Sequence, residues 1–165
     1  MKFLETKYGD LSSQDVTIAA VNIGGKNIDS LEGCPDILRG SLNAFTNDLE
    51  DLKGAPREVY GNVSFQDNLL TSLKGSLEMV VGNLDLSDNK LKNFDGSLRK
   101  VTGDLFVKDL QGFATIGDIE NALMAANIIV GGKVIGDSGD EFKQDPAKIQ
   151  EFSKGNRIGV LGDFL

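Results

Sequence analysis

The residues that could support catalysis are few, because the 165-residue chain contains no histidine. Histidine is the commonest general base and a frequent metal ligand, so Ser–His–Asp and Cys–His mechanisms and most zinc or iron sites are excluded. Carboxylates remain. Asp137, Asp140 and Glu141 offer oxygen ligands for calcium, but their spacing is not that of an EF-hand loop. We interpret them as a solvated turn and predict no metal or other cofactor.

Two short motifs are similar to catalytic segments but lack the residues that the chemistry needs. Gly136-Asp137-Ser138-Gly139 looks like the nucleophile segment of trypsin-like proteases, yet no histidine can accept the Ser138 proton. Gly131-Gly132-Lys133 lacks the wider G-x-x-x-x-G-K-[ST] frame of a phosphate-binding loop. We therefore predict that the chain is not an enzyme. An enzyme with a carboxylate site, using Asp85 and Asp104, is the least favoured alternative.

Asp85 and Asp104 belong to an internal repeat that organises most of the chain. Units starting at Leu31, Leu52 and Leu73 are 21 residues apart (52 − 31 and 73 − 52), and Phe94 keeps the period. One step back gives a degraded first unit at Asp10, so we count five units, of which the last is degraded too. A fixed period of this length predicts a stacked solenoid. The three regular units read LEGCPDILRGSLNAFTNDLED, LKGAPREVYGNVSFQDNLLTS and LKGSLEMVVGNLDLSDNKLKN.

Apolar residues recur at fixed positions, counting the first residue of each unit as position 1. Positions 12 and 14 are apolar and flank a polar residue in most units, which predicts a short strand with one buried face and a parallel sheet across the units. We expect Val59, Val80 and Val101 to fill the core behind this sheet. The five predicted inward pairs are Val21/Ile23, Leu42/Ala44, Val63/Phe65, Leu84/Leu86 and Leu105/Val107.

Glycine, asparagine and cysteine also keep their places in the repeat. Glycines at positions 3 and 10 predict left-handed backbone or close approach between coils. At position 17, Asn47, Asn68 and Asn89 predict a ladder of amides bonded to backbone groups, which stops at Lys26 and Leu110. The single cysteine, Cys34, stands where other units have alanine or serine, so we predict a packed small residue and not a reactive thiol.

The segment from Leu84 to Leu91, LDLSDNKL, has the form L-x-L-x-x-N-x-L and resembles the leucine-rich repeat signature. Val63 to Leu70 gives the same pattern with valine and phenylalanine substituted. The flanking form, L-K-G-x-P/L-x-x-V-x-G-N/D-L, is similar to short repeats of uncharacterised tailed-phage proteins. The resemblance covers roughly residues 10–112. It implies an α/β solenoid of short leucine-rich-repeat-like coils with a parallel β-sheet on one face, and a phage origin.

Residues 113–165 do not fit the repeat, and we predict that they form a mixed α+β C-terminal cap on the solenoid of residues 1–112. Thr115–Ala126 reads as a helix, Asn127–Ile135 as a hairpin around Gly131-Gly132, and GDSGDE as a turn. A second helix is expected to begin at Asp145-Pro146 and to end at Gly155. The alternative is a separately functional small domain.

The strand alternation also predicts which residues face outward, and these are our candidate partner-binding residues on a concave face. Most are small and polar, so two phenylalanines stand out as candidate anchors for a protein partner. The alternative is that the cap covers Phe106 and that Phe45 turns inward because Ala44 leaves room. The candidates are Asn43, Phe45, Ser64, Gln66, Asp85, Ser87, Phe106 and Lys108.

Charge and composition limit the classes of function that the chain can have. The net charge is −8 and the basic residues are scattered, which argues against direct binding of nucleic acid. No apolar run approaches the ~20 residues that cross a bilayer, and no signal peptide is evident, so we expect a cytoplasmic protein. We expect a non-catalytic protein–protein interaction module, acting as a virion or assembly component or as a binder of a host protein, with self-association left open. The alternative is an acidic nucleic-acid mimic that inhibits a DNA- or RNA-binding protein.

Overall fold

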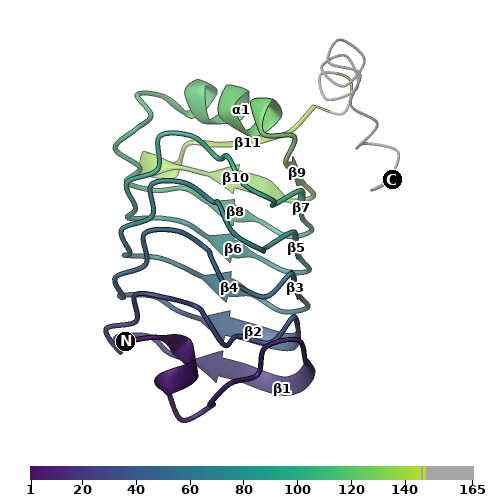
Figure 1. Ribbon diagram of the computed structural model, residues 1–165. Coiled ribbons are helices and arrows are strands. Elements are labelled where there is room, and N and C mark those ends of the chain that lie inside the picture. Colours follow the sequence, from purple (N-terminus) through teal and green to yellow (C-terminus); the bar gives the residue numbers. More distant parts are fainter. Residues whose placement is uncertain (146, 148–165) are drawn as a thin grey trace.

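A computed structural model describes residues 1–145 and 147 (Figure 1). These residues form a β-solenoid of about four turns with a parallel sheet and the α-helix α1. In Figure 1 the repeat units lie one above another as a column, with α1 at one end and β1 at the other. The second helix expected from Asp145 to Gly155 lies outside the described residues.

Most units contribute two short strands that meet at a corner, so the sheet consists of two parallel ladders. The first ladder contains β3 (Glu58–Val59), β5 (Met79–Val80), β7 (Lys100–Val101) and β9 (Ile129–Val130). The second ladder contains β4 (Val63–Ser64), β6 (Leu84–Asp85), β8 (Leu105–Phe106) and β10 (Lys133–Ile135). The longer β2 (Ile37–Asn43) spans the corner, pairing with β3 and β4 on one edge and with β1 (Asp15–Asn22) on the other.

The sequence predicted the second ladder and missed the first. Val59, Val80 and Val101 are fully buried, as expected of core residues. They lie in strands of their own, however, and not behind a sheet. The residues two places before and after each of these valines are a charged residue and a glycine, so no apolar–polar–apolar alternation reveals a strand there.

The glycines at position 10 form the corner between the two ladders. A Cβ atom added to Gly61 would lie 2.6 Å from the backbone of Gly40 in the preceding unit, and one on Gly82 would lie 2.6 Å from the carbonyl oxygen of Gly61. Consecutive coils therefore approach each other at this corner more closely than any side chain permits. The predicted close approach between coils is confirmed.

The core runs through the centre of the column as one continuous cluster of apolar side chains. All ten residues of the predicted inward pairs are buried, with exposed fractions of 2% or less. The residues that open the units, Leu31, Leu52, Leu73 and Phe94, are buried too. Each coil contributes too little apolar surface to be stable alone, so stacking of successive coils supplies the core.

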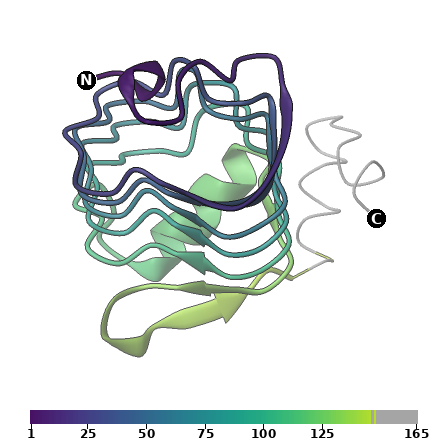
Figure 2. The same cartoon turned by 90° about the horizontal axis from the view of Figure 1, so that it is seen from below.

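Helix α1 (Ile116–Ala125) closes the C-terminal end of the column. Thr115 is its N-cap and forms a reciprocal capping box with Asp118, in agreement with the predicted helix. Ile119 and Leu123 are buried in the core, whereas the opposite side of the helix is exposed. Figure 2 shows α1 lying within the outline of the coils, as a lid must to shield the last layer from water.

The hairpin predicted at Asn127–Ile135 is wrong. β9 and β10 do not pair with each other; each adds in parallel to one ladder, with Val130 opposite Val101 and Val134 opposite Leu105. Gly131 and Gly132 are the corner between the ladders, because a Cβ atom on either would meet the backbone of Thr102 or Gly103. The antiparallel partner of β10 is β11 (Glu141–Lys143), reached through the 3₁₀ turn η2 (Asp137–Gly139).

Residues 1–9 cover the other end of the column, which the sequence did not indicate. Phe3, in the 3₁₀ helix η1 (Phe3–Glu5), is fully buried and stacks on Tyr8 with ring centroids 5.8 Å apart. The Tyr8 hydroxyl accepts the backbone N–H of Asn22 on the outer edge of β1 at 2.9 Å. β1 also has an irregular register between Thr17 and Ala20. Bulges and capped edge groups are common means of preventing unwanted strand pairing.

No helix among the described residues is long and apolar enough to cross a membrane.

Candidate functional site

The predicted outward residues lie on the exposed face of the second ladder, and Phe45 is the most exposed aromatic side chain there. Its exposed fraction is 45%, while the neighbouring Ala44 is fully buried. The Phe45 ring lies over Gly24 of the preceding unit, since a Cβ atom on Gly24 would be 2.7 Å from the ring. Phe45 therefore does not turn inward, and its ring occupies the space that a side chain on Gly24 would fill.

Phe106 occupies a different environment from Phe45. It is half-buried and lies in register with Asp85 on β6 and with Ile135 on β10. Because β10 extends the ladder beyond β8, Phe106 lies between two strands and not at the end of the sheet. It is packed on both sides but keeps part of its surface in contact with solvent.

The polar candidates on this face are joined by side-chain hydrogen bonds between successive units. Asn43 Nδ2 donates to Asn22 Oδ1 at 2.6 Å, and Gln66 Nε2 donates to Asp88 Oδ2 at 3.0 Å. Ser64 and Asp85 are half-buried, and Lys108 is exposed. Ser87 differs from the expectation: it is buried, and its hydroxyl accepts the Lys108 N–H at 3.0 Å. The face is thus an ordered polar surface around an exposed aromatic ring.

Behind this face, the predicted asparagine ladder at position 17 is confirmed. Asn68 Nδ2 donates to the carbonyl oxygens of Ala44 in the preceding unit and of Phe65 in its own, each at 3.0 Å, and its Oδ1 accepts the Leu49 N–H at 3.0 Å. Asn47 and Asn89 repeat this arrangement. The amides hold each strand exit against the one before it, so they fix the geometry of the face.

An exposed acidic column runs beside the ladder at position 16. Asp67, Asp88 and Asp109 all have left-handed backbone, with φ between 55° and 56° for the first two and 51° for Asp109. Asp137 follows in line and accepts the Asp109 N–H at 2.7 Å. The negative charges of Asp137 and Asp88 raise the pKa of the Asp109 carboxyl above its ordinary value. The carboxylates are therefore close enough to repel one another.

The face of the first ladder carries an aromatic residue that sequence reasoning missed. Tyr60 is 40% exposed, but its ring lies 5.0 Å from the Arg39 guanidinium. Its hydroxyl donates to Glu58 Oε2 at 3.0 Å, and this bond raises the Tyr60 pKa. Arg39 in turn forms a bidentate pair with Asp15. The sequence did carry a signal that Tyr60 faces outward, because position 9 lies between the buried valine or leucine at position 8 and the corner glycine at position 10.

The residues considered above as candidates for catalysis or metal binding lie apart from one another or are buried or hydrogen-bonded to the backbone. Cys34 is buried, which confirms the predicted packed residue, and desolvation raises the pKa of its thiol strongly. Ser138 is exposed in the turn after β10. Asp85 accepts the Ser87 N–H and Asp104 accepts the Lys133 N–H. In residues 1–145 and 147, no three His, Cys, Asp or Glu side chains converge as metal ligands would.

No family model, no curated protein and no solved structure matches this chain.

Proposed function

We propose that this chain is a non-catalytic protein–protein interaction module whose working surface is the exposed face of the second ladder. The exposure of Phe45 carries the proposal. An aromatic ring that is 45% exposed on a hydrogen-bonded polar sheet loses little freedom on binding and has much apolar area to bury. Phe106 extends the apolar part of the same face towards the C-terminal end.

A comparison of Phe45 with Tyr60 on the first ladder supports the choice of this face. The ring of Tyr60 is covered by Arg39, and its hydroxyl is used by Glu58, so a partner would have to displace both contacts. The Phe45 ring lies against Gly24, which has no side chain to displace. Phe45 and Tyr60 therefore form a matched pair of exposed aromatic residues, of which Tyr60 is already engaged by charged side chains.

We further propose that the units are short leucine-rich-type repeats and that the chain is phage-encoded. The LDLSDNKL signature at Leu84–Leu91 and the 21-residue period support this. On this proposal the protein is a virion or assembly component, or it binds a host protein in the host cytoplasm.

The test compares Phe45→Ser with Tyr60→Ser. The intact chain is used to capture partners by crosslinking in its native cellular context, and the recovered partner is then titrated against the purified variants. Phe45→Ser should weaken the affinity at least ~10-fold, as for a hot-spot aromatic residue, while Tyr60→Ser leaves it within about twofold. Both variants should keep the wild-type melting temperature to within about 2 °C. Equal losses in both variants, or a loss only in Tyr60→Ser, would place the contact elsewhere.

A second candidate function, the acidic nucleic-acid mimic, is favoured by the column of Asp67, Asp88, Asp109 and Asp137. A row of carboxylates with one member per coil presents negative charge in a line, as a phosphate backbone does. The same titration distinguishes the candidates. Binding through the carboxylates should weaken steeply between low and high salt and survive Phe45→Ser, whereas binding through Phe45 should depend little on salt.

A further inference from the structure

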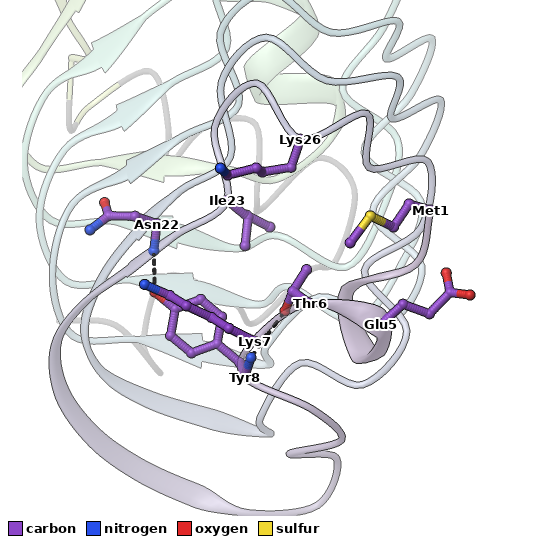
Figure 3. A pocket seen from close by; sticks show the side chains of 8 residues that line it. All are labelled: Met1, Glu5, Thr6, Lys7, Tyr8, Asn22, Ile23 and Lys26. Carbon is purple, nitrogen blue, oxygen red and sulfur yellow. Dashed lines mark hydrogen bonds between the residues drawn. The ribbon is translucent and has the colours of Figure 1, made fainter.

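A pocket of about 420 Å³ opens at the N-terminal end of the solenoid, and neither the repeat nor the proposed binding face explains it. Figure 3 shows its lining. Its volume lies in the ~300–1,000 Å³ range of small-molecule sites. The residues that line it are Met1, Glu5, Thr6, Lys7, Tyr8, Asn22, Ile23 and Lys26.

The pocket lies where the asparagine ladder ends. Lys26 occupies position 17, the place held by asparagine in the next three units. Its backbone N–H is fixed by Asn47 Oδ1 at 3.1 Å, and the same oxygen accepts the Ile28 N–H at 2.9 Å. Residues 1–9 form the 3₁₀ helix η1 and irregular backbone, not a repeat coil, so they do not offer an asparagine at position 26 the strand partners that Asn47 has in the unit before it. The lysine side chain lines the pocket instead of entering the core.

The inner wall is apolar and rigid. Ile23 belongs to the core and is only 1% exposed. Tyr8 is half-buried, stacked on Phe3 and bonded through its hydroxyl to Asn22. Figure 3 shows Ile23 between Lys26 on one side and Tyr8 on the other. Because Ile23 exposes only 1% of its surface, an apolar or aromatic body would be buried mainly against the half-buried Tyr8 ring, which is already held in place and costs little to order.

The charges at the rim are positive although the protein as a whole is strongly acidic. Lys7 lies along the Tyr8 ring, with its ammonium 5.2 Å from the ring centroid. Among the described residues, neither Lys7 nor Lys26 forms an ion pair with a carboxylate. The carboxylate of Glu5 bonds the Lys2 N–H and points away from both lysines in Figure 3. Two unpaired ammonium groups beside an apolar wall match an anionic group on an apolar body.

We propose that this pocket binds a small amphipathic anion, with its apolar body against Ile23 and Tyr8 and its anionic group between Lys7 and Lys26. The site does not depend on the proposed partner surface, although the Phe45 ring over Gly24 lies close to one side of it. The class comprises carboxylates, sulfonates and phosphate monoesters on an aliphatic or aromatic body.

The test uses two fluorescent probes that differ only in charge. 8-Anilinonaphthalene-1-sulfonate carries the sulfonate, and N-phenyl-1-naphthylamine is the same body without it. Both are titrated into the full chain with no residues added before Met1, because Met1 lines the pocket. We expect the sulfonate to bind the wild type more tightly, and the Lys7→Gln/Lys26→Gln double variant to lose about tenfold or more of that affinity. The neutral probe should change by less than about twofold.

Three controls make the result specific. Lys53→Gln/Lys74→Gln removes the same charge from two exposed lysines away from the pocket, and should leave the sulfonate affinity unchanged. Lys26→Arg in the Lys7→Gln background should recover part of the loss. Amide chemical-shift changes on adding the sulfonate should centre on Thr6–Tyr8 and Asn22–Lys26, and Phe45→Ser should not abolish them. Unchanged sulfonate affinity in the double variant, an equal loss for both probes, or shifts centred on Phe45 or Tyr60 would each overturn the proposal.

Discussion

Positions 16 and 17 of the repeat are adjacent in the sequence but lie in opposite environments. The asparagines at position 17 are between 3% and 7% exposed and bond the backbone of two successive units. The aspartates at position 16 are exposed, and the charges of Asp137 and Asp88 raise the pKa of Asp109. An amide is neutral and both donates and accepts, so copies can stack in every coil. A carboxylate only accepts and carries a charge, so each added copy adds repulsion.

The two columns are also fixed by different constraints. Hydrogen bonding determines which residue type fits position 17. Backbone conformation determines it at position 16, because every unit has a left-handed φ there. Gly25 fills the place in the first unit with φ of 65°, and Thr46 fills it in the second with φ of 52°. Short polar side chains tolerate this conformation better than branched ones. Substitutions in the two columns should therefore differ in size and in sign.

The largest effect on stability is expected from Asn68→Ala in the buried asparagine ladder at position 17. The change removes an amide that bonds the Leu49 N–H and the carbonyl oxygens of Ala44 and Phe65. The two carbonyl oxygens keep a second donor, Asn47 Nδ2 for Ala44 and Asn89 Nδ2 for Phe65, so the buried Leu49 N–H is the group left unsatisfied. The unsatisfied N–H costs about 1–3 kcal/mol and the lost hydrogen bonds to the carbonyl oxygens add to this, so the free energy of unfolding should fall by about 2 kcal/mol or more. Urea denaturation followed by circular dichroism measures it.

Asn121→Ala is the matched control, because Asn121 is exposed on α1. It should change stability by less than about 0.5 kcal/mol. If Asn68→Ala cost no more than this control, water would be replacing the amide, and the difference between the two columns would lose its basis.

Much of this architecture follows from the sequence because the repeat samples each environment several times. Apolar alternation, glycine and asparagine recur at fixed positions, and all three were assigned correctly. Phe45 was identified as an exception on a polar row, and its exposure agrees with that prediction. Repetition acts as an internal comparison, in which a single exposed position stands out against its equivalents.

The features that the sequence did not reveal are those that occur once or depend on distant pairing. Gly131-Gly132 fits a hairpin turn as well as a corner, and only pairing with β7 and β8 distinguishes the two. The sequence carried a weaker signal for the corner. The apolar–x–Gly–x–apolar pattern of Val101 to Leu105 recurs from Val130 to Val134. The spacing is 29 residues (130 − 101) instead of the 21 residues of the repeat (52 − 31). The insertion of α1 hid that match. The pocket at Lys26 depends on Tyr8, which belongs to no repeat.

A smaller effect, of opposite sign, is expected from Thr46→Asn in the exposed column. Threonine is β-branched and unfavourable at φ of 52°, whereas asparagine adopts left-handed backbone readily. The asparagine amide can also replace the Thr46 hydroxyl that donates to Asp67 Oδ2. We expect a gain of about 0.5–1 kcal/mol, measured as a higher melting temperature. Thr71→Asn, at an exposed site without positive φ, should give no gain; a lower melting temperature for Thr46→Asn would show that backbone strain does not govern position 16.

The smallest effect is expected from Asp109→Asn, which tests repulsion within the column. The Asp109 pKa is raised in the folded state, so its charged form opposes folding at neutral pH. This cost is fully present above the raised pKa and is relieved as the pH falls through it towards the unfolded value of about 3.9. Asparagine keeps the backbone and removes the charge, so the variant should melt slightly higher than wild type at pH 7 and low salt. The difference should shrink in high salt and vanish below about pH 4.

Asp95→Asn removes one charge away from the column and should show no such pH dependence; a gain for Asp109→Asn that is independent of pH and salt would mean that the carboxylates of this column do not repel one another.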